Sequence, residues 1–164
     1  MRHIQRWRFT QAMLQVAAFK VMDALPLGDE PRQFGQNEDR GFVWEAIGPA
    51  SNLKRLNFMI ASTKDVGALT KRLGWLTIAL KILYPGWNEI HEWLQTSLLQ
   101  AMQGKVLYDP ERDLKVFSPR QGVLIVALGA GDPVATEMPQ NNGDAIALNE
   151  IQAAPQPAPS LSES

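Results

Sequence analysis

The part of the sequence closest to a ligand-binding motif is the apolar run 123–128, which leads into Gly-Ala-Gly at residues 129–131. In dinucleotide-binding folds, G-x-G-x-x-G between a strand and a helix brings backbone amides to a pyrophosphate. Here Val134 occupies the third glycine position, and Pro139 leaves only a short helix. No Gly-Lys-Ser/Thr of a P-loop occurs in the chain. We therefore predict a final buried strand at 123–128, followed by a turn that binds no nucleotide.

Residues that act as nucleophiles or metal ligands are scarce. The 164-residue chain has no cysteine and two histidines, His3 and His91, which are far apart in the sequence. A metal site would need carboxylate ligands, and no nucleophile–base pair stands out. We predict a protein without enzymatic activity, with no metal, no cofactor and no small-molecule substrate.

Charge is distributed unevenly along the chain. Residues 1–127 contain all 16 Lys and Arg and 12 of the 17 Asp and Glu, a net charge of +4, whereas residues 128–164 carry −5. A basic body is suited to a polyanion or an anionic membrane. The acidic tail then either competes for the basic surface or keeps the protein in solution.

Six basic residues are concentrated between positions 51 and 83, where Asp65 is the one acidic residue. They are candidates for binding nucleic acid or another anion, and the alternative is the solvated face of two amphipathic helices. The candidate anion-binding residues are Lys54, Arg55, Lys64, Lys71, Arg72 and Lys81.

The N-terminal segment combines cations with aromatic residues, which suits an anionic membrane surface. The alternative is a core helix whose first turn frays. The candidate membrane-surface residues are Arg2, Arg6, Trp7, Arg8 and Phe9.

The elements that must position these residues are predicted from hydrophobic periodicity. Apolar residues at three- and four-residue spacing predict helices over 2–25, 42–47, 52–61, 63–83 and 88–103, with a polar loop at 26–41. The helix over 63–83 carries a regular heptad pattern, which indicates core packing or self-association. The candidate self-association residues are Val66, Leu69, Leu73, Leu76, Val123 and Ile125.

After Gly104 the period changes to two, which predicts a hairpin over 105–117 and a third strand over 123–128. We therefore predict an α+β fold: a mainly helical bundle of about five helices with a small C-terminal antiparallel three-stranded sheet. Residues 1–128 form a single globular domain, and the composition of 129–164 predicts a disordered acidic tail rich in Pro, Ala and Ser.

The leading functional hypothesis is a non-enzymatic, intracellular interaction or assembly protein. It would form homo-oligomers or bind a protein partner, and its basic body would contact an anionic membrane or nucleic acid. The layout of a helical body with a Pro-rich tail resembles small matrix- or capsid-like structural proteins of viruses and mobile elements.

The second hypothesis is a nucleic-acid-binding regulator with a winged-helix-like core, because a charged hairpin follows a helix. That helix, 88–103, has no Lys or Arg and carries two Glu, which disfavours the usual docking into the major groove. No apolar run reaches the length of a membrane span, and no signal peptide is recognisable, so we expect a cytoplasmic location.

Overall fold

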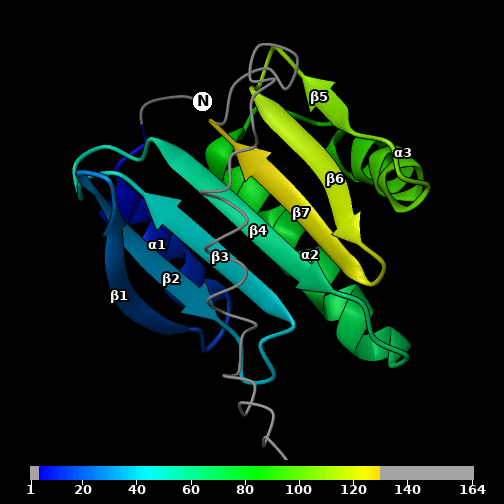
Figure 1. The fold of residues 1–164 in the computed structure, drawn as a ribbon, viewed down its shortest axis with the longest axis horizontal. Helices are drawn as coiled ribbons and strands as arrows, with labels where there is room; N and C mark the ends of the chain where they lie inside the picture. The colour runs from blue at the N-terminus through cyan, green and yellow to red at the C-terminus, as the bar shows by residue number, and fades with distance from the viewer. Residues whose placement is uncertain (1–3, 130–164) are drawn as a thin grey trace, which may run out of the picture. The chain divides into compact units, whose positions relative to one another are not determined.

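The computed structural model describes residues 4–129, which form three helices and one seven-stranded antiparallel sheet (Figure 1). The helices are α1 (Arg6–Val16), α2 (Val66–Leu83) and α3 (Ile90–Met102). The strands are β1 (Lys20–Leu27), β2 (Glu30–Gln36), β3 (Phe42–Ile47), β4 (Arg55–Ala61), β5 (Leu107–Asp109), β6 (Leu114–Arg120) and β7 (Val123–Leu128). Their order in the sheet is β1-β2-β3-β4-β7-β6-β5.

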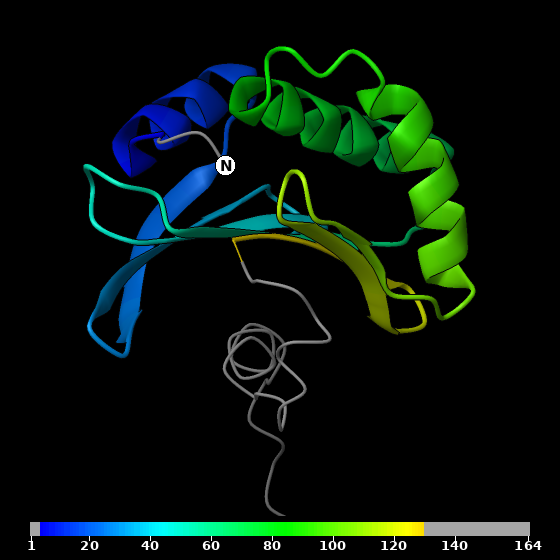
Figure 2. The same cartoon turned by 90° about the horizontal axis from the view of Figure 1, so that it is seen from above.

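The sheet is curved, and its two faces differ. Figure 2 shows α1 and α2 on the convex side and α3 beside the end of the sheet that carries β5 and β6. On the concave side, the described residues contribute no helix. The architecture is therefore one helical layer on one curved sheet.

The hydrophobic core lies between the helices and the convex face. Trp44 of β3 and Phe58 of β4 are fully buried there, and the ring of Phe9 from α1 meets the Trp44 ring edge-on at 5.5 Å between centroids. Leu80 of α2 and Leu94 of α3 belong to the same cluster. Burial of each such side chain is worth about 1.5–3 kcal/mol, so this layer is the main source of stability.

The prediction of a mainly helical bundle is wrong. Residues predicted as helix at 42–47 and 52–61 form or enter β3 and β4, and the predicted loop contains β2. The predicted N-terminal helix ends at Val16 and is followed by β1. The physical reason is that β3 is buried on both faces, so its six residues show no alternation and resemble part of a buried helix.

The C-terminal half was predicted more accurately, with one important error. Helices α2 and α3 and the strands β5, β6 and β7 occur where the periodicity predicts them. However, β7 pairs with β4 along its whole length, from Leu56↔Leu128 to Ala61↔Val123. The three strands are therefore one end of a single large sheet, and not a separate small one. The resemblance to matrix- or capsid-like proteins was based on a mainly helical body and loses that basis.

The turn after β7 is described only at its first residue. Gly129 has a positive φ of 74°, and a Cβ there would overlap the backbone carbonyl of Lys54. Its backbone N–H donates to the Asp113 carbonyl at 3.1 Å. Gly129 is thus required by a close approach of two chain segments. Gly131 and the predicted tail lie outside the described residues.

The hydroxyl of Tyr84, which follows α2, should make the stability of the fold depend on pH in the alkaline range. Its hydroxyl donates to the Arg112 carbonyl at 2.7 Å, and burial, with the charges of Asp113 and Asp109, raises its pKa from 10.0 to about 12. Because the pKa is higher in the folded state, this stabilising contribution is complete below pH 10 and is lost as the pH rises through 12.

We expect Tyr84→Phe to cost about 1 kcal/mol at pH 8, because it removes one hydrogen bond. The difference from the wild type should shrink between pH 10 and 12, since Phe has no proton to lose. Urea denaturation at a series of pH values measures this. A difference that stays constant across the range would contradict the assignment.

Candidate functional site

The concave face of the sheet is formed by alternate residues of successive strands, because side chains alternate between faces. The pairing register places one row across β1 to β6: Lys20, Gln36, Val43, Met59, Ile125 and Phe117. The next row contains Met22, Phe34, Glu45, Asn57, Ala127 and Lys115. These rows and the flanking residues make up the concave face, the flanking residues being Arg32, Ile47, Arg55, Arg120 and Val123.

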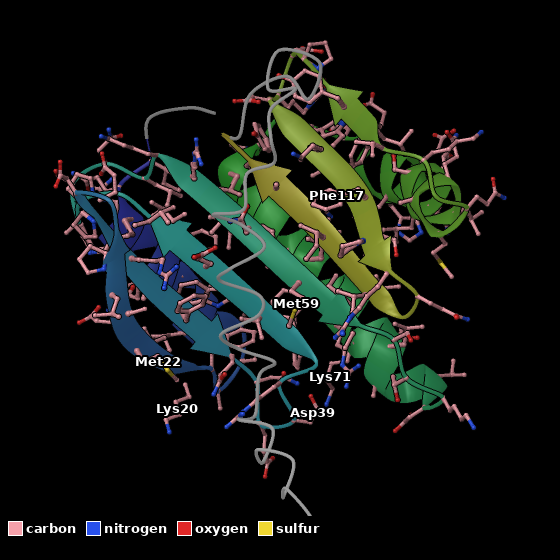
Figure 3. All side chains as sticks on the ribbon, viewed as in Figure 1. Lys20, Met22, Asp39, Met59, Lys71 and Phe117 are labelled. Atoms are coloured by element: carbon pink, nitrogen blue, oxygen red, sulfur yellow. The ribbon has the colours of Figure 1, made fainter. Side chains whose placement is uncertain are left out.

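The centre of the concave face is apolar. Val43, Met59 and Ile125 are cross-strand neighbours on three adjacent strands and are 3%, 7% and 4% exposed. Met22 and Phe117, nearer the two ends of the rows, are more exposed (Figure 3). A partner therefore meets the rim of this face first.

A polar network is embedded among these apolar side chains. Arg32 and Glu45 are both 6% exposed and form an ion pair, with 3.4 Å between Arg32 Nη1 and Glu45 Oε1. Asn57 Nδ2 donates to Glu45 Oε2 at 2.8 Å, and the Arg32 guanidinium lies 5.1 Å from the centre of the Phe34 ring. Buried charges require such partners. The network fixes β2, β3 and β4 relative to one another across the face.

Four cations surround the apolar centre. None of them forms an ion pair within residues 4–129, and Lys115 lies over the Phe117 ring with its Nζ 5.1 Å from the ring centre. Among the residues that make up the face, Glu45 is the one carboxylate. The face therefore combines an apolar floor with a positively charged rim, whose cations are Lys20, Arg55, Lys115 and Arg120.

No family model, curated protein or solved structure matches the chain. Function must therefore be argued from the chemistry of the site itself. Among residues 4–129, no group of three or more metal-ligating side chains comes together. In the same range no helix has both the length and the apolar character needed to cross a membrane.

The six candidate anion-binding residues do not form one surface. Lys54 and Arg55 are at the start of β4, whereas Lys64 follows its end, a separation of about 20 Å for a strand of this length. Lys54 pairs with Glu30. Lys71 and Lys81 are exposed on α2, in the helical layer, and Arg55 belongs to the concave face.

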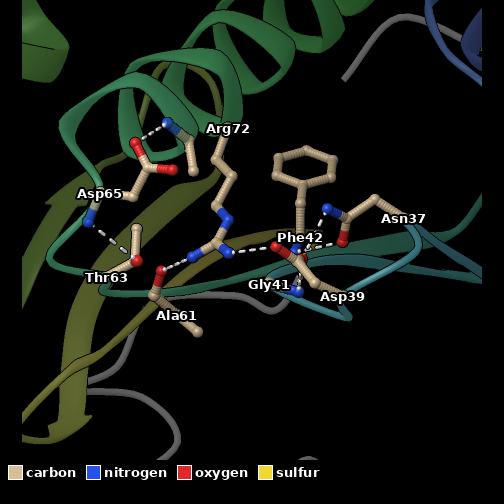
Figure 4. A network of polar contacts seen from close by, with 9 residues as sticks. Asn37, Asp39, Gly41, Phe42, Ala61, Thr63, Asp65 and Arg72 are labelled. Carbon is tan, nitrogen blue, oxygen red and sulfur yellow. Dashed lines mark hydrogen bonds and ion pairs between the residues drawn. The ribbon is translucent and has the colours of Figure 1, made fainter.

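Arg72, the remaining member of that set, is buried and has a structural role (Figure 4). Its Nη1 donates to the Ala61 carbonyl at 2.6 Å, and its Nη2 to Asp39 Oδ2 at 2.7 Å. Asp39 also accepts the Gly41 N–H at 2.7 Å. That backbone hydrogen bond, followed by the one from Arg72, lowers the pKa of Asp39. Arg72 thereby fastens the β2–β3 loop to α2 and to the end of β4.

The candidate membrane-surface residues are divided between core and surface. Trp7 is 49% exposed, and the Arg8 guanidinium lies 5.4 Å from the centre of its ring. Arg6 is partly buried, and Phe9 is fully buried in the core. Arg2 lies outside the described residues.

The candidate self-association residues are on two opposite faces. Val66 is 75% exposed at the first turn of α2, Leu69 and Leu73 are partly buried, and Leu76 is fully buried under the helix. Val123 and Ile125 lie on the concave face, on the other side of the sheet. The structure therefore does not unite the two sets.

The sequence reasoning missed the Arg32–Glu45 pair and the basic rim as a group. A signal was present in residues 55–61, Arg-Leu-Asn-Phe-Met-Ile-Ala, whose polar residues at alternate positions 55 and 57 fit a strand. However, only the pairing of that strand with 123–128, and of 123–128 with β6, places Arg55 on the same face as Lys115 and Arg120.

Proposed function

We propose that the protein is a non-enzymatic interaction protein that binds an acidic polypeptide segment carrying apolar side chains on its concave face. The observation that carries this proposal is the combination of an apolar centre with four unpaired rim cations on a sheet face that has no helix in residues 4–129. The rim cations offer charge complementarity to an acidic segment, and the more exposed Met22 and Phe117 offer it apolar contacts. A cytoplasmic location belongs to the same proposal, since a chain without cysteine needs no oxidising compartment.

Charge supports an acidic partner over a second copy of the chain. Two concave faces brought together would oppose the same rim cations, and like-charge contacts are costly. A segment with Glu or Asp would instead pair with Arg55 and Lys115, while its apolar residues reach Met22 and Phe117.

A nucleic acid is less well matched than a peptide. Recognition of single strands on sheets uses exposed aromatic rings on which bases stack. On the concave face, Phe34 is 9% exposed, which leaves its ring little accessible. Phe117 is only partly exposed.

The proposal is tested with charge reversal on the two sides of the sheet. A fluorescein-labelled peptide, three repeats of Glu-Glu-Leu-Glu, is titrated by fluorescence anisotropy against the full-length protein. We expect Arg55→Glu with Lys115→Glu to weaken binding at least about ten-fold, because two attractive contacts become repulsive. Lys71→Glu with Lys81→Glu makes the same charge change on α2, in the helical layer, and should alter affinity less than about two-fold.

Three outcomes would contradict the proposal. One is equal weakening by both double variants, which would indicate general charge attraction. Another is equal binding of a peptide with Lys in place of Glu. The third is tighter binding of a labelled single-stranded thymidine oligonucleotide, which would favour the nucleic-acid hypothesis. Thermal melts of the variants show whether each is folded.

A further inference from the structure

A second recessed surface lies between α3 and β5, and its charged residues are acidic, whereas those at the rim of the concave face are basic. It is a groove of about 550 Å³. One wall of the groove is formed by one face of α3 and the turn before it. The residues of this wall are three or four positions apart, so their side chains lie on the same face of the helix. The lining residues are Glu89, Glu92, Trp93, Thr96, Ser97 and Gln100, with Leu107 and Tyr108 from β5.

The groove is acidic, in contrast to the concave face. Neither Glu89 nor Glu92 forms an ion pair within residues 4–129. Residues 89–113 contain five Asp and Glu against Lys105 and Arg112. Arg112 is already paired with Asp109 at 2.8 Å. A cationic ligand would therefore find free carboxylates at this end of the molecule.

Ser97 gives the groove a polar group that the fold does not use. The residue is 5% exposed and lines the groove, and its hydroxyl makes no hydrogen bond within residues 4–129. The adjacent Thr96 differs, since its Oγ1 donates to the Glu92 carbonyl at 3.2 Å. Ser97 Oγ is not fully buried, so a ligand in the groove can hydrogen-bond to it in place of water.

The strand that forms the other wall is the last in the sheet. β5 pairs only with β6, through Leu107↔Val116 to Asp109↔Leu114. Within residues 4–129 its other edge pairs with no strand. Such an edge is a template on which an extended peptide adds a strand.

We infer that this groove binds an extended peptide segment carrying Lys or Arg side chains. The peptide backbone pairs with β5, one or two cations pair with Glu89 and Glu92, and Trp93 and Leu107 contact the aliphatic parts of the peptide. Ser97 hydrogen-bonds to a polar group of the bound segment. This inference is independent of the proposed function, because it concerns a different surface and the opposite charge.

The probe is a fluorescein-labelled peptide of four Lys-Thr repeats, titrated against the full-length protein by anisotropy. We expect saturable binding with Kd below about 1 mM. Glu89→Gln with Glu92→Gln should weaken it at least about ten-fold. Asp29→Asn with Glu38→Gln removes the same charge outside the groove and should change it less than about two-fold. Ser97→Ala should weaken binding about three-fold, with an unchanged melting temperature.

Strand addition is tested separately from charge attraction. On binding, backbone amides of Leu107–Asp109 should exchange more slowly with solvent, and a peptide N-methylated at alternate residues should lose most of its affinity. The inference is overturned by absence of saturable binding, by equal binding of a Glu-Thr repeat, by unchanged affinity of the double Gln variant, or by protection of amides elsewhere than β5.

Discussion

Replacement of Gly35 by alanine should reduce the free energy of unfolding by about 3 kcal/mol, because the added methyl group has no space. Gly35 of β2 is directly opposite Trp44 of β3, and a Cβ on it would overlap the Trp44 indole. The indole cannot move aside easily, since Trp44 is fully buried and packs against Phe9. Urea denaturation followed by tryptophan fluorescence measures the loss.

Two further variants separate this steric effect from a general effect of alanine. In a Trp44→Leu background, the additional cost of Gly35→Ala should fall below about 1 kcal/mol, because the overlapping ring atoms are gone. Gly74→Ala on the exposed side of α2 meets no neighbouring atom and should stabilise the protein by about 0.5–1 kcal/mol. An undiminished cost in the Leu background would show that the indole is not the cause.

Loss of the Arg72 guanidinium should have the second largest effect. We expect Arg72→Leu to lower the free energy of unfolding by about 2–4 kcal/mol, because it removes charge-assisted hydrogen bonds to the Ala61 carbonyl and to Asp39. Arg72→Lys should recover only part of this, since one ammonium does not reproduce the planar fork. Chemical denaturation at neutral pH measures both.

The neighbouring residue and the pH dependence provide controls. Lys71→Leu alters the exposed side of the same helical turn and should change stability by less than about 0.5 kcal/mol. The folded state lowers the pKa of Asp39, so its contribution is present above the ordinary value of 3.8 and is lost as the pH falls below it. This acid-induced loss should be smaller in Arg72→Leu than in the wild type. Equal stabilities of the Arg72 and Lys71 variants would contradict the structural role of Arg72.

The sequence predicted those elements whose periodicity is strong in itself. The heptad pattern of α2 and the alternation in 105–117 are local properties, and both led to the right element. β3 was missed because a short apolar run buried on two faces has no period to detect. In β4 the alternation covers only the first half of the strand, which is too short to distinguish it from a helix. The boundary between α1 and β1 was missed because residues 17–19 contain no Gly or Pro to indicate a break.

The candidate site was less predictable than the fold, because it depends on register. Counting charges identified a basic body but did not distinguish exposed cations from buried ones. Lys71 is exposed, whereas the adjacent Arg72 is buried and bonded to Asp39, 33 residues away in the sequence. Lys115 and Arg55 share the concave face only because β7 lies between β6 and β4. Long-range pairing of this kind leaves little trace in a single sequence.

The position of β7 has a consequence for the route by which the protein folds. This strand is the last described element in the chain, yet it joins β4 to β6 in the middle of the sheet. During synthesis, β1 to β4 can form successive hairpins. The edge of β4 that faces away from β3 stays unpaired until β7 has been synthesised, more than sixty residues later. Contacts between segments so distant in sequence form late and slowly. The nascent chain therefore exposes a long apolar strand edge until its final strand arrives, and that interval is when aggregation is most favourable.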